Sequence, residues 1–132
     1  MVSKNRTLRI SDRIRDELAT ILLYEISDPR LSGVSVTDVN VDRELSYANV
    51  FVSALEGSSR ADEILAGLTH AQGFLRRELA QRIDLFMFPK LRFFWDPTFE
   101  KAEKIEKLIQ SLHEGEQNEP GSEQSGEQAD NG

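Results

Sequence analysis

The stretch GVSVTDVNVDRELSYANVFVSAL, residues 33–55, decides the fold class of this chain. Its second half is dense in residues that favour strands, and apolar side chains alternate onto both faces. In its first half, Val34 and Val36 share one face, whereas Val39 and Val41 share the other, a change of phase that a β-bulge between the two pairs would produce. The link between the halves is short and polar. We therefore predict an antiparallel hairpin whose second strand lies inside a sheet.

Two periodic stretches beside the hairpin predict helices. In residues 8–26, apolar side chains recur at steps of three and four residues and form one stripe. Residues 60–83 carry two such stripes, separated by Ala71-Gln72-Gly73. Because an internal glycine costs a helix about 1 kcal/mol relative to alanine, we predict two helices that meet at an angle near this glycine.

A third strand and a last helix complete the chain. LRFFWDP (91–97) alternates like a strand, and residues 98–112 carry one apolar helical stripe. The resulting order is helix, strand, strand, helix, helix, strand, helix, which predicts an α+β domain with helices packed on one face of a three-stranded sheet. From Glu114 onward there are six acidic residues, no basic ones and a single apolar side chain. We predict one folded domain over 1–113 and a disordered acidic tail over 114–132.

The charge of the chain is unevenly distributed. Sixteen basic and 23 acidic residues give a formal net charge of −7, which argues against a nucleic-acid partner. Without the six acidic residues of the tail, the remainder has a charge of −1, and residues 1–15 and 70–94 have local charges of +4 and +3. If these two segments meet in space, they form a basic face suited to a phosphate backbone. The alternative is a set of arginines that are solvated separately.

Composition excludes several classes of protein. Without cysteine there is no disulfide, thiol nucleophile, Cys-ligated zinc or iron–sulfur cluster, and two histidines leave little for a metal site. No glycine-rich phosphate loop or hydrolase motif is present. We therefore predict no catalytic residue, metal, cofactor or small-molecule substrate; a hydrolase using His70 has the least support. No apolar run approaches the roughly 20 residues of a membrane span, and the basic start lacks an apolar stretch behind it, so we expect a cytoplasmic protein.

The segment THAQGFLRR (69–77) is the best candidate for a binding site. A helix that starts at Gly73 would present unpaired N–H groups and a positive dipole end to a phosphate. Arg76 and Arg77 would add charge and planar guanidinium groups for bidentate contacts. The alternative is that Ala71 and Gly73 are small only so that two helices can pack closely, and both interpretations can hold together.

Six segments, in this order and spacing, make the chain resemble the bacterial ribosome-binding factor A family over residues 5–112. They are RISDRIRDELATIL (9–22), EISDPRL (25–31), DRELSYANVFV (42–52), AQGFLRREL (71–79), PKLRFFWD (89–96) and IEKLI (105–109). The resemblance implies a type II KH-like fold in which an A-x-G kink replaces the usual G-x-x-G loop; the kink corresponds here to Ala71-Gln72-Gly73.

The resemblance also implies a function. Members of this family are non-catalytic, cold-shock-associated assembly factors that bind the free small ribosomal subunit and support late maturation and processing of its 16S rRNA. We accordingly expect a monomer whose partners are the small subunit and its rRNA, bound through backbone and shape, with most of Phe93, Phe94 and Trp95 in the core rather than stacking on bases. A protein–protein adaptor is the alternative. The candidate RNA-binding residues are Ala71, Gln72, Gly73, Arg76, Arg77, Arg6, Arg9, Arg13, Arg30, Arg82 and Lys90.

Overall fold

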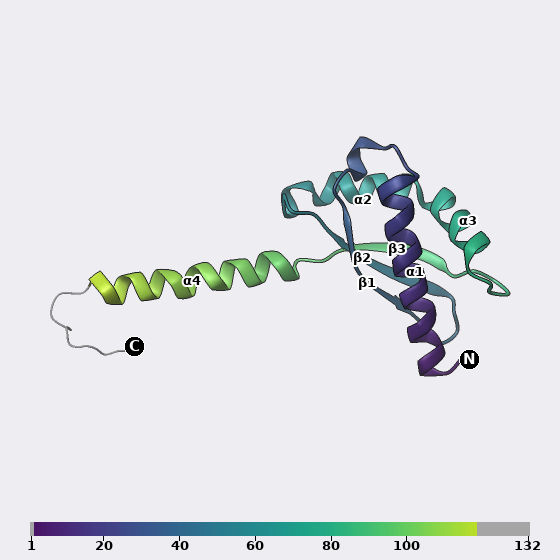
Figure 1. Ribbon diagram of the computed structural model, residues 1–132, viewed down its shortest axis with the longest axis horizontal. Helices are drawn as coiled ribbons and strands as arrows, with labels where there is room; N and C mark the ends of the chain where they lie inside the picture. The colour runs from purple at the N-terminus through teal and green to yellow at the C-terminus, as the bar shows by residue number, and fades with distance from the viewer. Residues whose placement is uncertain (1, 119–132) are drawn as a thin grey trace. The chain divides into compact units, whose positions relative to one another are not determined.

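The computed structural model describes residues 2–118, which belong to two units divided after Pro97. The first contains a mixed three-stranded sheet and three α-helices (Figure 1). In chain order its elements are α1 (Lys4–Tyr24), β1 (Ser35–Val41), β2 (Tyr47–Ser53), α2 (Ala61–His70), α3 (Gln72–Arg82) and β3 (Lys90–Trp95), with short 3-10 turns η1 (Pro29–Leu31) and η2 (Ser58–Arg60).

The sheet has the order β1-β2-β3, so the hairpin's second strand is central, as predicted. β1 and β2 pair antiparallel, and β3 joins β2 in parallel, which requires the α2–α3 crossover between them. The β1–β2 register shifts between Val36 and Asp38, which confirms the predicted bulge. Beyond the bulge, Val39 pairs with Val50, so the extra residue keeps the valines of β1 on one face.

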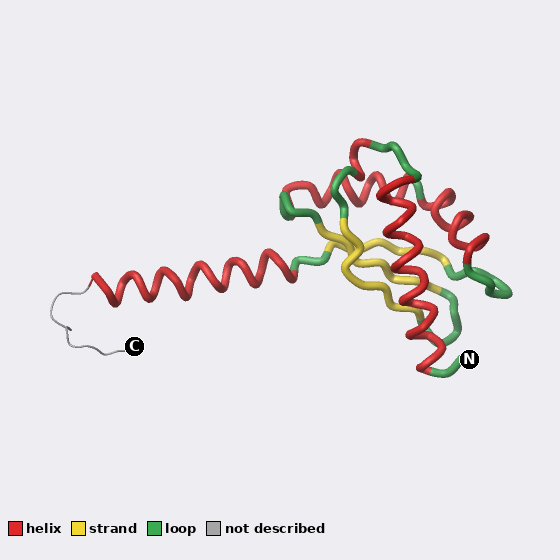
Figure 2. Tube along the Cα trace, viewed as in Figure 1, coloured by secondary structure: helices red, strands yellow, loops and turns green. Residues whose placement is uncertain are grey.

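One face of the sheet is buried beneath the helices, as predicted (Figure 2). Ala48, Val50 and Val52 of β2 are fully buried and alternate with partly exposed residues. Burying one valine, leucine or isoleucine side chain contributes about 1.5–3 kcal/mol, so this layer is the main stabilising element of the first unit. Buried side chains of the three helices pack against this face of the sheet: Ile14, Leu18 and Ile21 of α1, Ile64 and Leu68 of α2, and Leu75 and Leu79 of α3.

The opposite face of the sheet keeps aromatic side chains partly exposed. Phe51 and Phe94 stack with ring centroids 5.4 Å apart, and the Arg92 guanidinium lies 3.8 Å from the centroid of Tyr47. Phe93 and Trp95, by contrast, pack against the core, in agreement with the expectation for most of this aromatic run.

The break between α2 and α3 lies at Ala71, two residues before the predicted Gly73. Ala71 has a ψ of 1° and its N–H still bonds to the carbonyl of Gly67, so it joins the two helices without a long loop. A Cβ added at Gly73 would meet nothing within 4 Å, whereas one at Gly67 would lie 3.0 Å from Cδ2 of Leu31. Close packing therefore explains Gly67 and does not explain Gly73.

The second unit contains α4 (Thr98–Asn118), which begins where we predicted a helix and ends later. It continues through residues 114–118, the start of the predicted tail, because Glu and Gln are good helix formers and extend the preceding periodic stretch. The rest of the predicted tail lies outside the described residues. The division after Pro97 also falls within the stretch 1–113 that we predicted as one domain. Between residues 2 and 118, no helix is both long enough and apolar enough to span a membrane.

Candidate nucleic-acid interface

The kink and the helix that follows it each present one candidate residue to solvent. Gly73 and Arg77 are exposed and lie one turn apart on α3, and no side chain caps the start of that helix. Arg77 makes no ion pair or side-chain hydrogen bond within residues 2–118. We call Gly73 and Arg77 the kink surface. It combines a free cation with the positive end of a helix, an arrangement that favours an anion.

The other two residues of the kink face inward. Ala71 is buried, and Nε2 of Gln72 donates a hydrogen bond of 2.6 Å to the carbonyl oxygen of Leu91. This bond ties the first turn of α3 to β3. Both residues therefore help to position the kink surface; the Ala71 side chain is buried, whereas that of Gln72 is half-buried and bonded to β3.

Arg76 holds the loop between α3 and β3. Its Nη2 donates to the carbonyl of Phe88 at 2.5 Å and its Nε to the carbonyl of Pro89 at 3.2 Å. Since both acceptors are neutral, the guanidinium keeps its full charge. Arg76 is thus a structural residue that also contributes positive potential to its surroundings.

Arg13 and Arg82 are paired internally. Arg82 contacts the carboxylates of Glu25, Glu17 and Glu78, and the pKa of its guanidinium is raised, chiefly by the hydrogen bond to Glu25. Arg13 donates from Nη2 to the carbonyl of Arg82 at 2.8 Å and lies 3.6 Å from Glu17. This cluster joins α1 to the end of α3 and leaves no net positive charge there.

Arg30 is likewise neutralised by a neighbour. Its Nη2 lies 2.7 Å from Oδ2 of Asp28, and this pairing lowers the pKa of the Asp28 carboxyl and raises that of Arg30. The carbonyl of Arg30 accepts a hydrogen bond from Arg60. Arg60, which the sequence did not single out, also bonds to the carbonyl of Ser32 and so holds η1 against α2.

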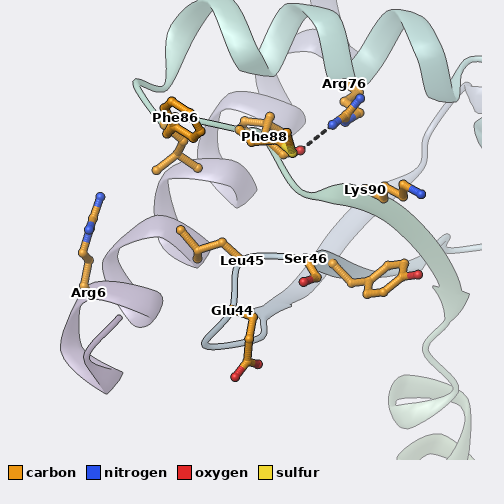
Figure 3. Close-up of a pocket in the computed structure, with 11 residues that line it drawn as sticks. Arg6, Glu44, Leu45, Ser46, Arg76, Phe86, Phe88 and Lys90 are labelled. Carbon is orange, nitrogen blue, oxygen red and sulfur yellow. Dashed lines mark hydrogen bonds between the residues drawn. The ribbon is translucent and has the colours of Figure 1, made fainter. Parts of the chain in front are cut away.

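The remaining candidates, Arg6, Arg9 and Lys90, are exposed and have no acidic partner within residues 2–118. Arg6 and Lys90 lie on the rim of a cavity of about 550 Å³, together with Arg76 (Figure 3). We call this cavity the basic pocket. Arg6 comes from the basic segment 1–15 and the other two from 70–94, so the two segments do meet in space. Its remaining lining residues are Glu44, Leu45, Ser46, Tyr47, Leu85, Phe86, Met87 and Phe88.

Sequence reasoning missed the apolar part of this pocket. Phe86 is fully exposed and Met87 is 69% exposed, both in the loop that Arg76 holds. The signal was the run LFMF (85–88) between a predicted helix and a predicted strand, with no periodic partner for its side chains. His70 is exposed, and among residues 2–118 no three His, Cys, Asp or Glu side chains gather as metal ligands would.

Comparisons with known proteins agree with the sequence resemblance. The family model described as ribosome-binding factor A matches residues 6–109. The ribosome-binding factor A of Nitrosomonas eutropha is 42% identical over 105 residues, which cover 80% of this chain and 90% of that protein. The crystal structure of ribosome-binding factor A from Thermus thermophilus is 25% identical, with a TM-score of 0.61, over 67% of this chain and 93% of that one.

A second match is to another set of coordinates for the Thermus thermophilus factor. It is a homology model fitted into the cryo-electron-microscopy map of a complex with the 30S subunit, 28% identical, with a TM-score of 0.53, over 63% of this chain and 87% of that one. The family model spans most of the first unit and half of α4. Together with the element order, these matches show that the chain belongs to the ribosome-binding factor A family.

Proposed function

We propose that this protein is a ribosome assembly factor that binds the free small ribosomal subunit and supports late maturation and processing of its 16S rRNA. The observation that carries the proposal is family membership across residues 6–109, including a neighbour whose coordinates were fitted into a map of its 30S complex. The protein binds RNA and catalyses no reaction. It acts in the cytoplasm as a monomer. Light scattering of the purified chain would measure the oligomeric state.

The proposed RNA contacts are the cations whose charge is not neutralised within the chain. They are Arg77 on the kink surface, Arg9 on α1, and Arg6, Arg76 and Lys90 at the basic pocket. The internally paired Arg13, Arg30 and Arg82 position elements and contribute less to RNA binding. Contacts from exposed Lys and Arg side chains to phosphates fix position without reading sequence, so binding through them depends on the backbone and shape of folded rRNA and weakens with salt.

The test is co-sedimentation with purified free small subunits from a bacterium. We expect the full chain to co-sediment and Arg77→Glu to bind several-fold more weakly, because one charge reversal removes a phosphate contact and adds repulsion. Arg15→Glu is the matched control, since Arg15 is also exposed on a helix and unpaired within residues 2–118 but lies outside the proposed surface. Arg76 is left intact because its loss would release the α3–β3 loop.

Three results would contradict the proposal. The first is that the wild-type chain does not bind free small subunits. The second is that binding survives nuclease digestion of exposed rRNA and changes little with salt, in which case the protein is an adaptor for another protein. If Arg77→Glu and Arg15→Glu both bind small subunits as tightly as the wild type does, the kink surface does not contact the rRNA. The maturation role is tested in cells that lack the factor. We expect precursor 16S rRNA to accumulate in these cells and the wild-type gene to reverse the accumulation.

A further inference from the structure

The basic pocket has the size of a site for one small ligand. Its volume of about 550 Å³ falls in the range of roughly 300–1,000 Å³ that is usual for such sites. Its walls come from the start of α1, the turn between β1 and β2, and the loop between α3 and β3. Figure 3 shows Arg6 and Phe86 on one side of the cavity and Lys90 on the other.

Phe86 is held at the rim of this pocket without packing into the core. Its neighbour Phe88 is buried, and Arg76 binds the carbonyls of Phe88 and Pro89, so the loop is anchored at its base. The fully exposed Phe86 ring is therefore presented in a fixed region of the chain. An exposed aromatic ring offers a nucleobase a stacking surface at little further cost in ordering.

The polar rim of the pocket favours an anion. It carries three cations, Arg6, Arg76 and Lys90, against one acid, Glu44. Arg6 and Lys90 have no acidic partner or side-chain hydrogen bond within residues 2–118 to offset their charge. Cations beside an apolar and aromatic floor suit a ligand that is planar at one end and anionic at the other, as a nucleotide is.

We infer that the basic pocket takes one unstacked nucleotide of single-stranded RNA, with its base against Phe86 and its phosphates beside Lys90 and Arg6. The inference rests on the proposed function and adds to it. The kink surface binds backbone phosphate, whereas the pocket requires a base that is free to leave its stack. The factor therefore recognises rRNA at a place where a strand is unpaired.

The test compares two RNA probes with the full chain in fluorescence anisotropy: a labelled single-stranded hexauridylate and a labelled blunt RNA duplex. We expect Phe86→Ala to weaken hexauridylate binding about tenfold, the loss typical of one base–aromatic stack, and to leave duplex binding unchanged. Leu55→Ala is the matched control because Leu55 is 90% exposed and lies outside the pocket. Both variants should keep the melting temperature of the wild type, since both side chains are exposed.

The charge on the rim is tested separately. Lys90→Gln should lower the slope of log affinity against log salt for hexauridylate by about 0.7, the contribution of one phosphate contact to a single strand. Arg15→Gln, which removes an exposed charge outside the pocket, should leave that slope unchanged. Crosslinking of a 4-thiouridine hexanucleotide to the peptide that contains Phe86 would place the base directly.

Three results would overturn the inference. Phe86→Ala could bind hexauridylate as the wild type does, or it could lose single-stranded and duplex binding equally. It could also keep hexauridylate binding and lose binding to small subunits, in which case the pocket takes an acidic segment of a ribosomal protein. Whether the wild type co-sediments with small subunits is measured independently, so failure of the proposed function can be told apart from failure of this inference.

Discussion

Gly67 and Gly73 belong to adjacent helices and have opposite surroundings. At Gly67 an added Cβ would lie 3.0 Å from Cδ2 of Leu31 and 3.2 Å from Cβ of Arg30, and the second atom is held by the backbone of η1. At Gly73 the same atom would meet nothing within 4 Å. A glycine in open space inside a helix weakens the fold by about 0.5–1 kcal/mol. The exposed side of Gly73 is thus where a ligand can approach the backbone closely.

The two alanine variants test this difference. We expect Gly67→Ala to lower the free energy of unfolding by about 1 kcal/mol, because overpacking of about 1–3 kcal/mol outweighs the gain in helix propensity. Gly73→Ala should raise it by about 0.5–1 kcal/mol and weaken binding to small subunits, since the methyl group would stand between helix and phosphate. Urea unfolding and co-sedimentation measure the two effects. A Gly73→Ala variant that is more stable and binds as tightly as the wild type would show that no ligand touches this residue.

The cations illustrate what sequence can predict at the scale of a residue. Arg77 and Arg82 both lie on α3, and local sequence treats them alike. Arg82 is neutralised because α1 brings Glu17 and Glu25 to the end of α3, and that arrangement exists only after folding. Sequence could therefore identify two basic segments, but it could not predict that they meet or which of their side chains retain a free charge.

The turn between β1 and β2 is organised by one carboxylate. Oδ1 of Asp42 accepts hydrogen bonds of 2.8 Å from the N–H groups of Ser46 and Tyr47. The turn also contains Leu45 at a φ of 58°, a backbone conformation that residues other than glycine rarely adopt. The hydrogen bond from the Tyr47 N–H is the main reason that the pKa of Asp42 is lowered from its usual 3.8.

A lowered pKa in the folded state has a defined effect on stability against pH. The charged form of Asp42 is favoured by folding, so its contribution is complete above the usual pKa and is lost as the pH falls through the lower, folded pKa. We expect Asp42→Asn to reduce the free energy of unfolding at pH 7 by about 1 kcal/mol. The variant should also lose less of its stability than the wild type as the pH falls. Urea unfolding at pH 7 and pH 3 measures both. Asp12→Asn, at an exposed position on α1 without an ion pair or side-chain hydrogen bond within residues 2–118, should change neither; an equal effect at both sites would refute a specific role for Asp42.

The elements themselves could be predicted where their signal is local. The changed phase of the valines indicated the bulge, since a strand alternates with a period of two whatever its partner. The break between α2 and α3 was predicted within two residues, because glycine signals weak helix propensity without showing which backbone bond is lost. The α3–β3 loop was not predicted to matter. Its shape depends on hydrogen bonds from Arg76 to backbone carbonyls, and every residue has such a carbonyl, so the sequence does not indicate which ones are used.

At the scale of the whole molecule, the net charge of −7 conceals a local reversal of sign. The basic pocket combines three cations with one acid, although acidic residues outnumber basic ones in the chain. A nucleic acid at this surface experiences the local field more strongly than distant charges, because salt screens interactions beyond about 8–10 Å. We therefore expect the acidic end of the chain to affect RNA binding mainly when little salt is present.

Removal of the last fourteen residues tests that effect. Residues 119–132 contain four acidic residues and no basic ones, so truncation after Asn118 changes the net charge from −7 to −3 and keeps α4 complete. We expect the truncated chain to bind unrelated RNA several-fold more tightly than the full chain at about 20 mM salt, with little difference near 300 mM, as screening of exposed charges requires. Filter binding across a salt series measures this. A full-length variant with Glu119→Gln, Glu123→Gln, Glu127→Gln and Asp130→Asn should behave like the truncated chain, because it removes the charge and keeps the length. If it behaves like the wild type while truncation tightens binding, the segment acts by occupying space and its charge is incidental.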